Sequence, residues 1–250
     1  DVTGSVIAAA VNATVYENFT DVDYVFCANP KVIKDPKPIS YFTYEEMREL
    51  SYAGFNVLHE ETLEPVFRAG IPVCIKNTNN PSSPGTKITV SRTTGSDKVV
   101  GIACDKGFCA IYVSKYLMNR EIGFGRRLFQ ILEEEGLSYE HSPSSIDSIS
   151  VIVRESDLDK VGESKLVDRI IKGLAVDEVS VSRDLALVHI VGEGMRNTIG
   201  IAKTATAALA DANINIELIN QGASEISIIF GVKGADADRA VVALYNAFFK

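Results

Sequence analysis

Two short stretches, Asn119-Arg120-Glu121-Ile122-Gly123 and Arg196-Asn197-Thr198-Ile199-Gly200, reveal how the chain is organised. They lie 77 positions apart, and the same offset aligns more than thirty residues without a gap, pairing Met118 with Met195. Chance seldom gives an ungapped alignment that also keeps its hydrophobic periodicity. The chain therefore contains two copies of one supersecondary unit.

Each copy predicts the same order of elements. Strands are expected at 108–113 and 185–191, where residues alternate or run apolar and β-branched. Helices are expected at 123–135 and 200–211, where apolar residues recur at helical spacing. The remaining elements are two strands and a helix in each copy: 137–140, 148–153 and 164–174, then 214–218, 225–232 and 237–249.

The closing strand distinguishes the two copies. The first copy gains one from 178–182, whereas the second reaches the end of the chain after its last helix. We expect segment 98–104, otherwise an orphan strand, to supply that edge, so that the first copy is inserted into the second. The order strand–helix–strand–strand–helix–strand is the ferredoxin-like βαββαβ pattern.

The residues before the repeat alternate between helix and strand, which predicts a layered α/β fold. The expected helices are 3–13, 44–53 and 61–69, and the expected strands are 15–19, 71–75 and 86–90. Segment 91–98 has the composition of a linker. We therefore predict three domains, at 1–90, 105–183 and 184–250.

Composition narrows the class of protein. Of 250 residues, 46% are hydrophobic and 23% charged, which is ordinary for a globular chain. The formal net charge of −8 disfavours a nucleic-acid binder, because phosphate contacts need clustered Lys and Arg. There is no apolar run long enough for a bilayer and no signal-peptide layout, so we expect a cytoplasmic protein that makes no membrane contact.

Cysteine and histidine spacing points to no metal site. Cys27, Cys74, Cys104 and Cys109 form no C-x-x-C pair and are expected to be reduced thiols. His59, His141 and His189 lie far apart in the sequence and show no zinc spacing.

The first residues are unusual. Asp1-Val2-Thr3-Gly4 leads straight into an apolar stretch, 6–11, that reads as a helix already in progress, which Asp1 or Thr3 could cap. A natural chain would begin with Met and usually with a less committed segment. We expect the sequence to be truncated at this end.

Few residues of the first ninety could carry chemistry. Thr20-Asp21-Val22-Asp23 follows a strand, where open α/β sheets place ligands, and its carboxylates could contact a ribose or a nucleotide-borne Mg²⁺. Lys31 and Lys76 could neutralise phosphate oxygens. Taken alone, these residues fit a solvated turn and surface lysines better. The motifs 123–125 and 192–194 are too incomplete for a dinucleotide fingerprint.

The repeat offers a second candidate site. The loop Met118–Phe124 and the segment Ser138-Tyr139-Glu140 should meet at one edge of the first copy. Amides at a helix N-terminus suit a carboxylate, and Glu140 suits an ammonium, so the pair describes an amino-acid site. The alternative is that Met118 packs in the core and Glu140 pairs with an arginine such as Arg120. The residues by themselves favour that alternative.

Several segments, in order, resemble the aspartate kinase family. Asp1-Val2-Thr3-Gly4 is similar to the end of its G-G-S-D-x-T-G motif, and residues 16–23 are similar to Y-E-x-W-T-D-V-D. Val57-Leu58-His59 and residues 71–78 are similar to V-L-H-P-R-T and I-P-x-x-V-K-N-T. The repeat, including residues 221–228, resembles the family's paired ACT domains.

The resemblance covers essentially the whole chain and implies both fold and activity. It implies the nucleotide-binding, C-terminal part of a three-layer amino-acid-kinase (carbamate-kinase-like) sheet at 1–90, followed by two ferredoxin-like ACT domains. The family phosphorylates the β-carboxylate of L-aspartate with ATP and Mg²⁺, at the start of the route to lysine, threonine and methionine. The implied catalytic residue is Asp1. The implied nucleotide contacts are Thr20, Asp21, Phe26, Lys31, Lys76 and Asn77.

For the sensor, the resemblance supports the amino-acid site over the packing alternative. The implied effector-binding residues are Met118, Gly123, Phe124, Ser138, Tyr139, Glu140, Ser144 and Ser145. Lysine is the expected effector, because Glu140 offers an anion to its side-chain ammonium, which threonine would not need. An effector held between ACT domains of two subunits would shift the population toward a poorly active arrangement, so we expect at least a dimer.

The chain also departs from the family's pattern. Tyr24 replaces a glycine, Asn29 an aspartate and Lys31 an arginine, and Glu60-Glu61 replace Pro-Arg, which puts nucleotide binding in doubt. The K-x-G-G-T-S segment with the catalytic lysine is absent, so we expect these 250 residues alone to lack kinase activity. The alternatives are a non-catalytic amino-acid-binding regulatory subunit and a purely structural oligomerisation module.

Overall fold

The computed structural model describes residues 1–55, 60–93 and 97–250. The motif Val57-Leu58-His59 lies outside the described residues. The chain divides into two compact units. Unit 1 consists of Asp1–Asp105, Val188–Phe230 and Asp236–Lys250, and unit 2 of Lys106–Leu187 and Gly231–Ala235.

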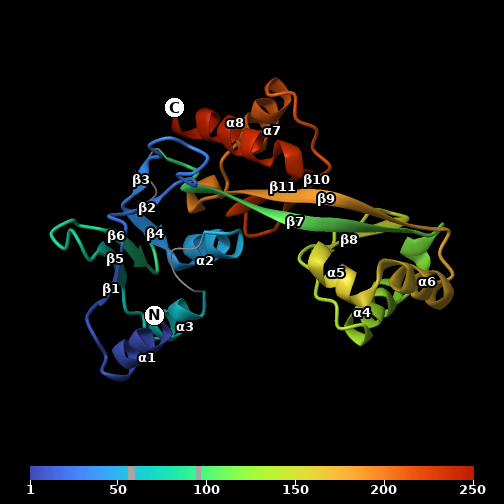
Figure 1. Ribbon diagram of the computed structural model, residues 1–250, viewed down its shortest axis with the longest axis horizontal. Helices are drawn as coiled ribbons and strands as arrows, with labels where there is room; N and C mark the ends of the chain where they lie inside the picture. The colour runs from blue at the N-terminus through green and yellow to red at the C-terminus, as the bar shows by residue number, and fades with distance from the viewer. Residues whose placement is uncertain (56–59, 94–96) are drawn as a thin grey trace. The chain divides into compact units, whose positions relative to one another are not determined.

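The amino-terminal part of unit 1 is a small α/β assembly. Its helices are α1 (Val2–Ala10), α2 (Tyr44–Tyr52) and α3 (Glu60–Arg68). Its strands are β1 (Tyr16–Thr20), β2 (Val25–Phe26), β3 (Pro38–Ile39), β4 (Tyr41–Thr43), β5 (Val73–Asn77) and β6 (Thr86–Thr89). Four strands form one sheet in the order β1-β5-β6-β4, and β2 pairs with β3. Helices α1 and α3 pack beside each other below that sheet in Figure 1.

Local sequence explains why α2 forms. Thr43 accepts a hydrogen bond from the amide of Glu46 while the Glu46 carboxylate accepts one from the amide of Thr43, which is a capping box. Met47 and Leu50 follow at helical spacing and are both fully buried. Helix α1 begins after Asp1 as expected, although the Asp1 side chain makes no capping hydrogen bond.

The repeat contributes the second sheet. Its strands are β7 (Gly101–Ser114), β8 (Ser148–Arg154), β9 (Glu178–Val191), β10 (Leu218–Gln221) and β11 (Ser227–Lys233), in the order β10-β11-β9-β7-β8. Its α-helices are α4 (Phe124–Glu134), α5 (Glu155–Val161), α6 (Glu163–Leu174), α7 (Ile201–Asp211) and α8 (Ala237–Phe249). Three short 3₁₀ helices are η1 (Met118–Arg120), η2 (Glu193–Met195) and η3 (Gly234–Asp236).

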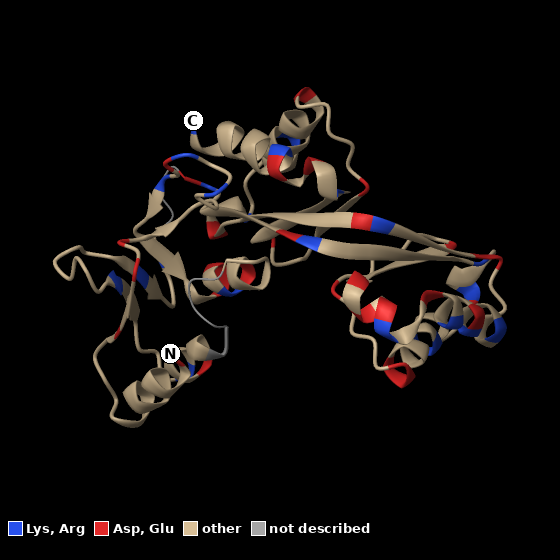
Figure 2. Cartoon of the chain, in the orientation of Figure 1, with Lys and Arg blue, Asp and Glu red and all other residues tan. Residues whose placement is uncertain are grey.

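Unit 2 has its own hydrophobic core. Helices α4, α5 and α6 lie together beside strands β7 and β8 (Figure 1). Leu128 and Leu132 of α4, Val151 of β8 and Ile170 of α6 are at most 1% exposed within one apolar cluster. Outside this core, Lys and Arg are interspersed with Asp and Glu along the helices (Figure 2), and Arg169 pairs with both Glu134 and Glu135. The described part of unit 2 therefore presents mixed charge rather than a basic surface.

The structure corrects several predicted strands. Residues 101–104 of the predicted strand 98–104 and all of segment 108–113 belong to one continuous strand, β7, whereas residues 98–100 lie outside it. Segments 178–182 and 185–191 both belong to β9. Gly107 and Asp184 lie between the strands that were predicted separately. Both have positive φ, 87° and 61°, yet the strands continue through them. The predicted domain limits at 105 and 184 therefore fall inside β7 and β9. We keep the division into three domains as a proposal.

Two further predictions were wrong. Residues 137–140 form no strand; isolated bridges at His141 and Ser144, with a few backbone hydrogen bonds around them, join the following residues to β8. Pro143 lacks an N–H and interrupts the ladder there. The strand expected at 214–218 lies at Leu218–Gln221 instead, and α5 was not predicted. Among the described residues, no helix is long and apolar enough to cross a membrane.

Candidate functional site

The first candidate site lies at the carboxyl ends of two neighbouring parallel strands. Strand β1 pairs with β5 so that Phe19 lies opposite Lys76 and Thr20 opposite Asn77. The amide of Thr78 donates to the carbonyl of Thr20 (2.8 Å), which continues the pairing past the strand ends. The two segments singled out from the sequence, 20–23 and 76–77, therefore meet at one sheet edge, where α/β folds place ligands.

An aspartate organises this edge. The Asp23 carboxylate accepts hydrogen bonds from the side-chain amides of Asn77 (2.9 Å) and Asn80 (3.2 Å). Asp21 is exposed, and its carboxylate accepts from the Thr20 hydroxyl (3.2 Å). Asp23 thus fixes the loop after β5, and Asp21 is left facing solvent as the carboxylate that a ligand could reach.

Lys76 points to the other face of the strand from Asn77, because successive side chains alternate. Its ammonium lies 3.4 Å from the Glu17 carboxylate and 5.8 Å from the centre of the Phe19 ring. The Lys76 side chain is 20% exposed. Glu17 and Phe19 therefore hold a cation close to the strand ends, where an anionic ligand would compete with Glu17 for it over a contact of 3.4 Å.

The other predicted nucleotide residues lie in separate segments. Phe26 is half-buried in β2, opposite Pro38 of β3. Lys31 is exposed in a turn where its amide donates to the Asn29 side-chain oxygen (2.9 Å). Asn29 thus supplies the acceptor that an aspartate would supply at this position. Asp1 lies at the start of α1, and its carbonyl accepts from the Tyr16 hydroxyl (3.0 Å).

The second candidate site surrounds the amino-terminal end of α4 in unit 2. Gly123 occupies the N-cap position with φ 77°, and no side chain caps the helix. Met118 and Phe124 are 7% and 3% exposed and belong to the core cluster. Their side chains thus form the floor beneath the loop, so a ligand would meet the backbone amides of this helix end.

Glu140, in the segment after α4, is a partly desolvated carboxylate. Its amide donates to the carbonyl of Ile152 (2.8 Å), and its side chain is 19% exposed. Burial raises the pKa of the Glu140 carboxyl, and the nearby Arg154 partly opposes that increase. The carboxylate lies 3.7 Å from Nε of Arg154, not beside the expected Arg120.

The remaining predicted effector residues lie in the segment between α4 and β8. Ser138, Ser144 and Ser145 are exposed, and the amide of Ser145 donates to the carbonyl of Ser148 (2.8 Å). Tyr139 is 46% exposed and stacks on Phe129 with ring centres 4.7 Å apart. Ser138 and Tyr139 directly precede Glu140, and Ser144 and Ser145 follow it by four and five residues.

The equivalent position in the second copy is hollow. A cavity of about 320 Å³ is bordered by Met195, Gly200 and Ile201, the counterparts of Met118, Gly123 and Phe124. Here Glu225 accepts from the amide of Asn197 (2.7 Å) and ties the loop down. Both copies thus have a left-handed glycine at this helix N-cap, and in the second copy Glu225, the counterpart of Ser148, fixes the loop.

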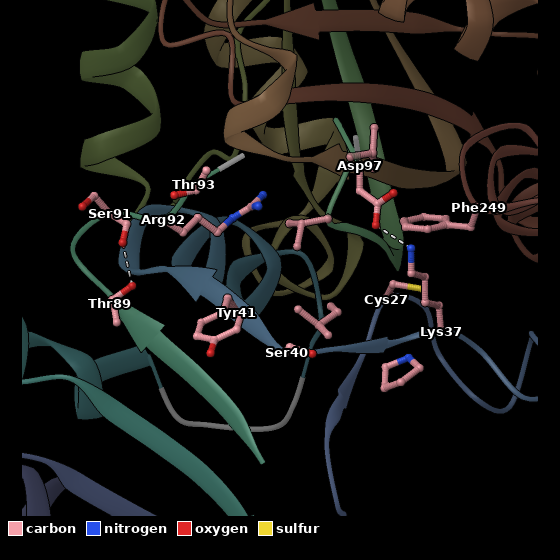
Figure 3. Close-up of a pocket in the computed structure, with 14 residues that line it drawn as sticks. Cys27, Lys37, Ser40, Tyr41, Thr89, Ser91, Arg92, Thr93, Asp97 and Phe249 are labelled. Atoms are coloured by element: carbon pink, nitrogen blue, oxygen red, sulfur yellow. Dashed lines mark hydrogen bonds and ion pairs between the residues drawn. The ribbon is translucent and has the colours of Figure 1, made fainter. Parts of the chain in front are cut away.

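A larger cavity of about 540 Å³ lies within unit 1, and Figure 3 shows its lining. Lys37 and Arg92 both contribute to the wall. Lys37 pairs with Asp97 (2.5 Å) and Arg92 with Glu46 (2.6 Å), so both cations already have carboxylate partners. An anionic ligand would have to break one of these pairs, and we assign it no ligand.

Sequence reasoning missed the residues that hold the candidate sites together. Glu17 and Asn80 support the strand edge, and Arg154 and Phe129 support the effector loop. Glu17 lies in the motif at residues 16–23, but the motif does not show that Glu17 contacts Lys76, 59 residues away. No quoted motif contains Asn80, Phe129 or Arg154. Only the 77-residue repeat could have pointed to the cavity in the second copy.

Comparison with known proteins agrees with this architecture. The amino acid kinase family matches residues 1–77, and the ACT domain matches residues 188–248. Aspartokinase 3 of Bacillus subtilis is 57% identical over 249 residues, which are 100% of this chain and 55% of that protein. The chain thus spans about half the length of this relative.

Solved structures give the same result. The aspartate kinase of Clostridium acetobutylicum superposes with a TM-score of 0.94 at 45% identity, covering 99% of this chain and 57% of that one. Aspartokinase III of E. coli, in complex with aspartate and ADP (R-state), superposes with a TM-score of 0.84 at 26% identity, covering 100% and 55%. The same enzyme with lysine and aspartate (T-state) gives 0.81, at the same identity and coverage.

The fold therefore combines part of an amino acid kinase with ACT domains, which confirms the predicted fold class. More specifically, the chain belongs to the aspartokinase family.

Proposed function

We propose that the protein acts as an aspartate kinase, which transfers a phosphoryl group from ATP to L-aspartate and forms 4-phospho-L-aspartate and ADP. This is the first step toward lysine, threonine and methionine. The observation that carries the proposal is the β1–β5 edge, where Thr20, Asp21, Lys76 and Asn77 meet in a chain of this family.

The strand edge would bind the nucleotide. Phosphoryl transfer depends mainly on positioning and on neutralising the charge of the phosphates. Lys76 would supply that charge, since Glu17 and Phe19 hold its ammonium near the strand ends. Thr20 and Asn77 would contribute polar contacts, and Lys31 and Phe26 would approach from the following segments.

Magnesium would enter bound to the nucleotide. The described residues contain no group of three or more His, Cys, Asp or Glu side chains arranged to hold a metal. Asp21 is the exposed carboxylate at the edge, since Asp23 is occupied by Asn77 and Asn80. One carboxylate together with phosphates is a common way of holding Mg²⁺.

The catalytic lysine segment of the family is not among these 250 residues. Asp1 would serve catalysis only together with that segment and with a substrate-binding arginine. We therefore propose that the 250-residue chain on its own turns over no aspartate, and that the intact protein does.

The ACT domains would sense lysine. The uncapped end of α4 offers amides to a carboxylate, and Glu140 offers a partly desolvated anion to the side-chain ammonium. The E. coli relative has been crystallised with lysine and aspartate in its T-state. That relative is 26% identical, so the choice of lysine over threonine rests mainly on Glu140.

Self-association through the ACT domains would complete the sensor. Tyr116, Ile122 and Ile146 of unit 2 are 74%, 96% and 68% exposed, which is unusual for large apolar side chains. A second copy of the chain would cover them. Sedimentation should therefore show at least a dimer.

A coupled assay for ADP tests the activity. The intact protein should form ADP only when L-aspartate, ATP and Mg²⁺ are all present. Lys76→Met should weaken ATP binding roughly 10- to 100-fold, because a charge-assisted hydrogen bond contributes about 1.5–3 kcal/mol. Lys87→Met, on the adjacent strand β6, is the matched control and should have little effect.

The result also separates this proposal from its main alternative. Equal effects of Lys76→Met and Lys87→Met would remove Lys76 from the nucleotide site. An intact protein that binds lysine but never forms ADP would instead be a non-catalytic regulatory subunit.

A further inference from the structure

Glu46 is a fully buried carboxylate that lies outside both candidate sites. It belongs to the first turn of α2, and its side chain is 0% exposed. One of its oxygens accepts from the amide of Thr43 (2.9 Å) and from Nε of Arg92 (2.8 Å). The other accepts from Nη2 of Arg92 (2.6 Å) and from the amide of Glu193 (2.8 Å). All four bonds end on one side chain.

These partners come from three segments of unit 1. Thr43 begins α2, within the part that matches the amino acid kinase family. Glu193 begins η2, within the part that matches the ACT domain. Arg92 lies between the two matched parts, in the wall of the cavity in Figure 3. Glu46 therefore connects the two recognised folds and the segment between them.

The η2 turn is also packed tightly against that intervening segment. A Cβ on Gly192 would overlap the carbonyl oxygen of Lys98, and a Cβ on Gly194 would lie 2.8 Å from its Cα. The amide of Val100 donates to the carbonyl of Val191 (2.7 Å). The Gly192-Glu193-Gly194 motif, unsuited to nucleotide binding, thus has a different role: its glycines permit close backbone contact.

The same turn continues toward the loop that borders the second-copy cavity. The Thr198 hydroxyl donates to the carbonyl of Gly194 (2.7 Å), and Thr198 lines that cavity. A displacement of the loop would therefore move η2, and η2 is hydrogen-bonded to Glu46 through its first amide.

We propose that Glu46, clamped by Arg92, is the positioning residue through which the ACT part of the chain controls the kinase part. It holds η2 and the start of α2 in one fixed arrangement. A change at the ACT domains must break or move this contact to alter the kinase part. The inference rests on the proposed feedback regulation. The claim that Glu46 holds η2 and the start of α2 together can be tested separately.

The geometry explains why a charge is needed at this position. Four donors converge on Glu46, two on each oxygen, and the Arg92 side chain is only 11% exposed. In Glu46→Gln, one oxygen becomes an NH₂ group that faces two donors, so two of the four bonds are lost whichever way the amide turns. The substitution keeps shape and volume and removes half of the hydrogen bonds that hold Glu46.

Glu45→Gln is the matched control. Glu45 is the neighbouring residue of the same helical turn and faces the same ACT part through Arg196, at 3.8 Å. That pair is exposed, with side-chain exposures of 60% for Glu45 and 50% for Arg196. Both variants remove one negative charge, but only Glu46→Gln changes the buried contact with Arg92 and Glu193.

The experiment measures lysine inhibition of the intact protein, with kcat and Tm recorded for each variant. We expect Glu46→Gln to raise the lysine concentration for half inhibition at least tenfold, with kcat changed less than threefold. Glu45→Gln should behave as the wild type. A purely structural role would lower Tm and leave the inhibition curve in place, and that outcome overturns the proposal. If Glu46→Gln does not fold, Arg92→Lys, which keeps the charge but loses the two-point contact, is judged by the same criteria.

Amide hydrogen exchange tests the Glu46 contact independently of effector binding. Glu46→Gln should accelerate exchange at least tenfold at Thr43 or at Glu193, whichever amide faces the new NH₂ group, and Glu45→Gln should accelerate neither. Unchanged exchange at both amides overturns the proposal even if lysine inhibits. If lysine neither binds nor inhibits the wild type, the proposed lysine sensing fails, and exchange at these two amides still decides whether Glu46 holds the two parts together.

Discussion

Glu140→Gln tests the proposed lysine site most directly. The substitution removes the negative charge and keeps the shape of a side chain that is 19% exposed and lies beside Arg154 of β8. Opposite charges 4 Å apart attract by about 4 kcal/mol at the effective dielectric constant of a protein surface. Arg154, at 3.7 Å, already uses part of that attraction. A charge-assisted hydrogen bond of about 1.5–3 kcal/mol is therefore the reasonable expectation.

This energy corresponds to roughly 10- to 100-fold weaker lysine binding. Calorimetric titration of the intact protein measures the affinity, and the ADP assay measures inhibition. kcat without lysine should remain unchanged. Glu217→Gln is the matched control, because Glu217 occupies the equivalent position in the second copy, 77 residues later. Equal lysine affinity in wild type and Glu140→Gln would refute the role of Glu140.

The pH dependence of binding follows from the same residue. Burial raises the pKa of the Glu140 carboxyl, so protonation begins at a higher pH than for an exposed glutamate. Only the ionised form attracts an ammonium, so lysine affinity should fall as the pH is lowered through that raised pKa. The Glu140→Gln variant should lack this dependence. The raised pKa also means that the folded state binds this proton more tightly, so stability from this group falls as pH rises.

Three further predictions concern packing and reactivity. Gly194→Ala should lower the free energy of unfolding by about 1–3 kcal/mol, measured by thermal unfolding, because the added Cβ would lie 2.8 Å from Cα of Lys98. Gly222→Ala is the control and should be nearly neutral, because the nearest atom to its added Cβ lies at 3.8 Å. Leu128→Ala should cost about 2–5 kcal/mol in denaturant titration, since Leu128 is 0% exposed in the core of unit 2; a loss below about 1 kcal/mol would contradict that packing. A thiol reagent at pH 8 should label Cys104 before Cys27 and Cys109, because burial raises the pKa of both of those thiols to about 11. Rapid labelling of Cys27 or Cys109 would contradict their burial.

Local sequence determined most of the secondary structure. The helices expected at 44–53, 164–174 and 237–249 appear within a residue or two of their predicted limits. Their apolar residues repeat at the helical period, and that period is a property of a few consecutive turns. The 77-residue repeat likewise fixed the presence of two related units, because both copies are written in the sequence. The resemblance to aspartate kinases rests on short motifs that can be read one at a time.

Long-range contacts decided what the sequence left open. Glu140 pairs with Arg154 on β8 rather than with Arg120, because pairing along the sheet brings that strand beside it. Gly107 and Asp184 lie between strands that were predicted separately, yet strand pairing carries β7 and β9 through them. Glu46 begins as the partner in a local capping box, which the sequence from Thr43 to Glu46 is enough to specify. Its contacts with Arg92 and Glu193 exist only once the chain has folded. Arg92 lies 46 positions after Glu46 in the sequence and Glu193 lies 147 positions after it, and both must reach the same buried carboxylate.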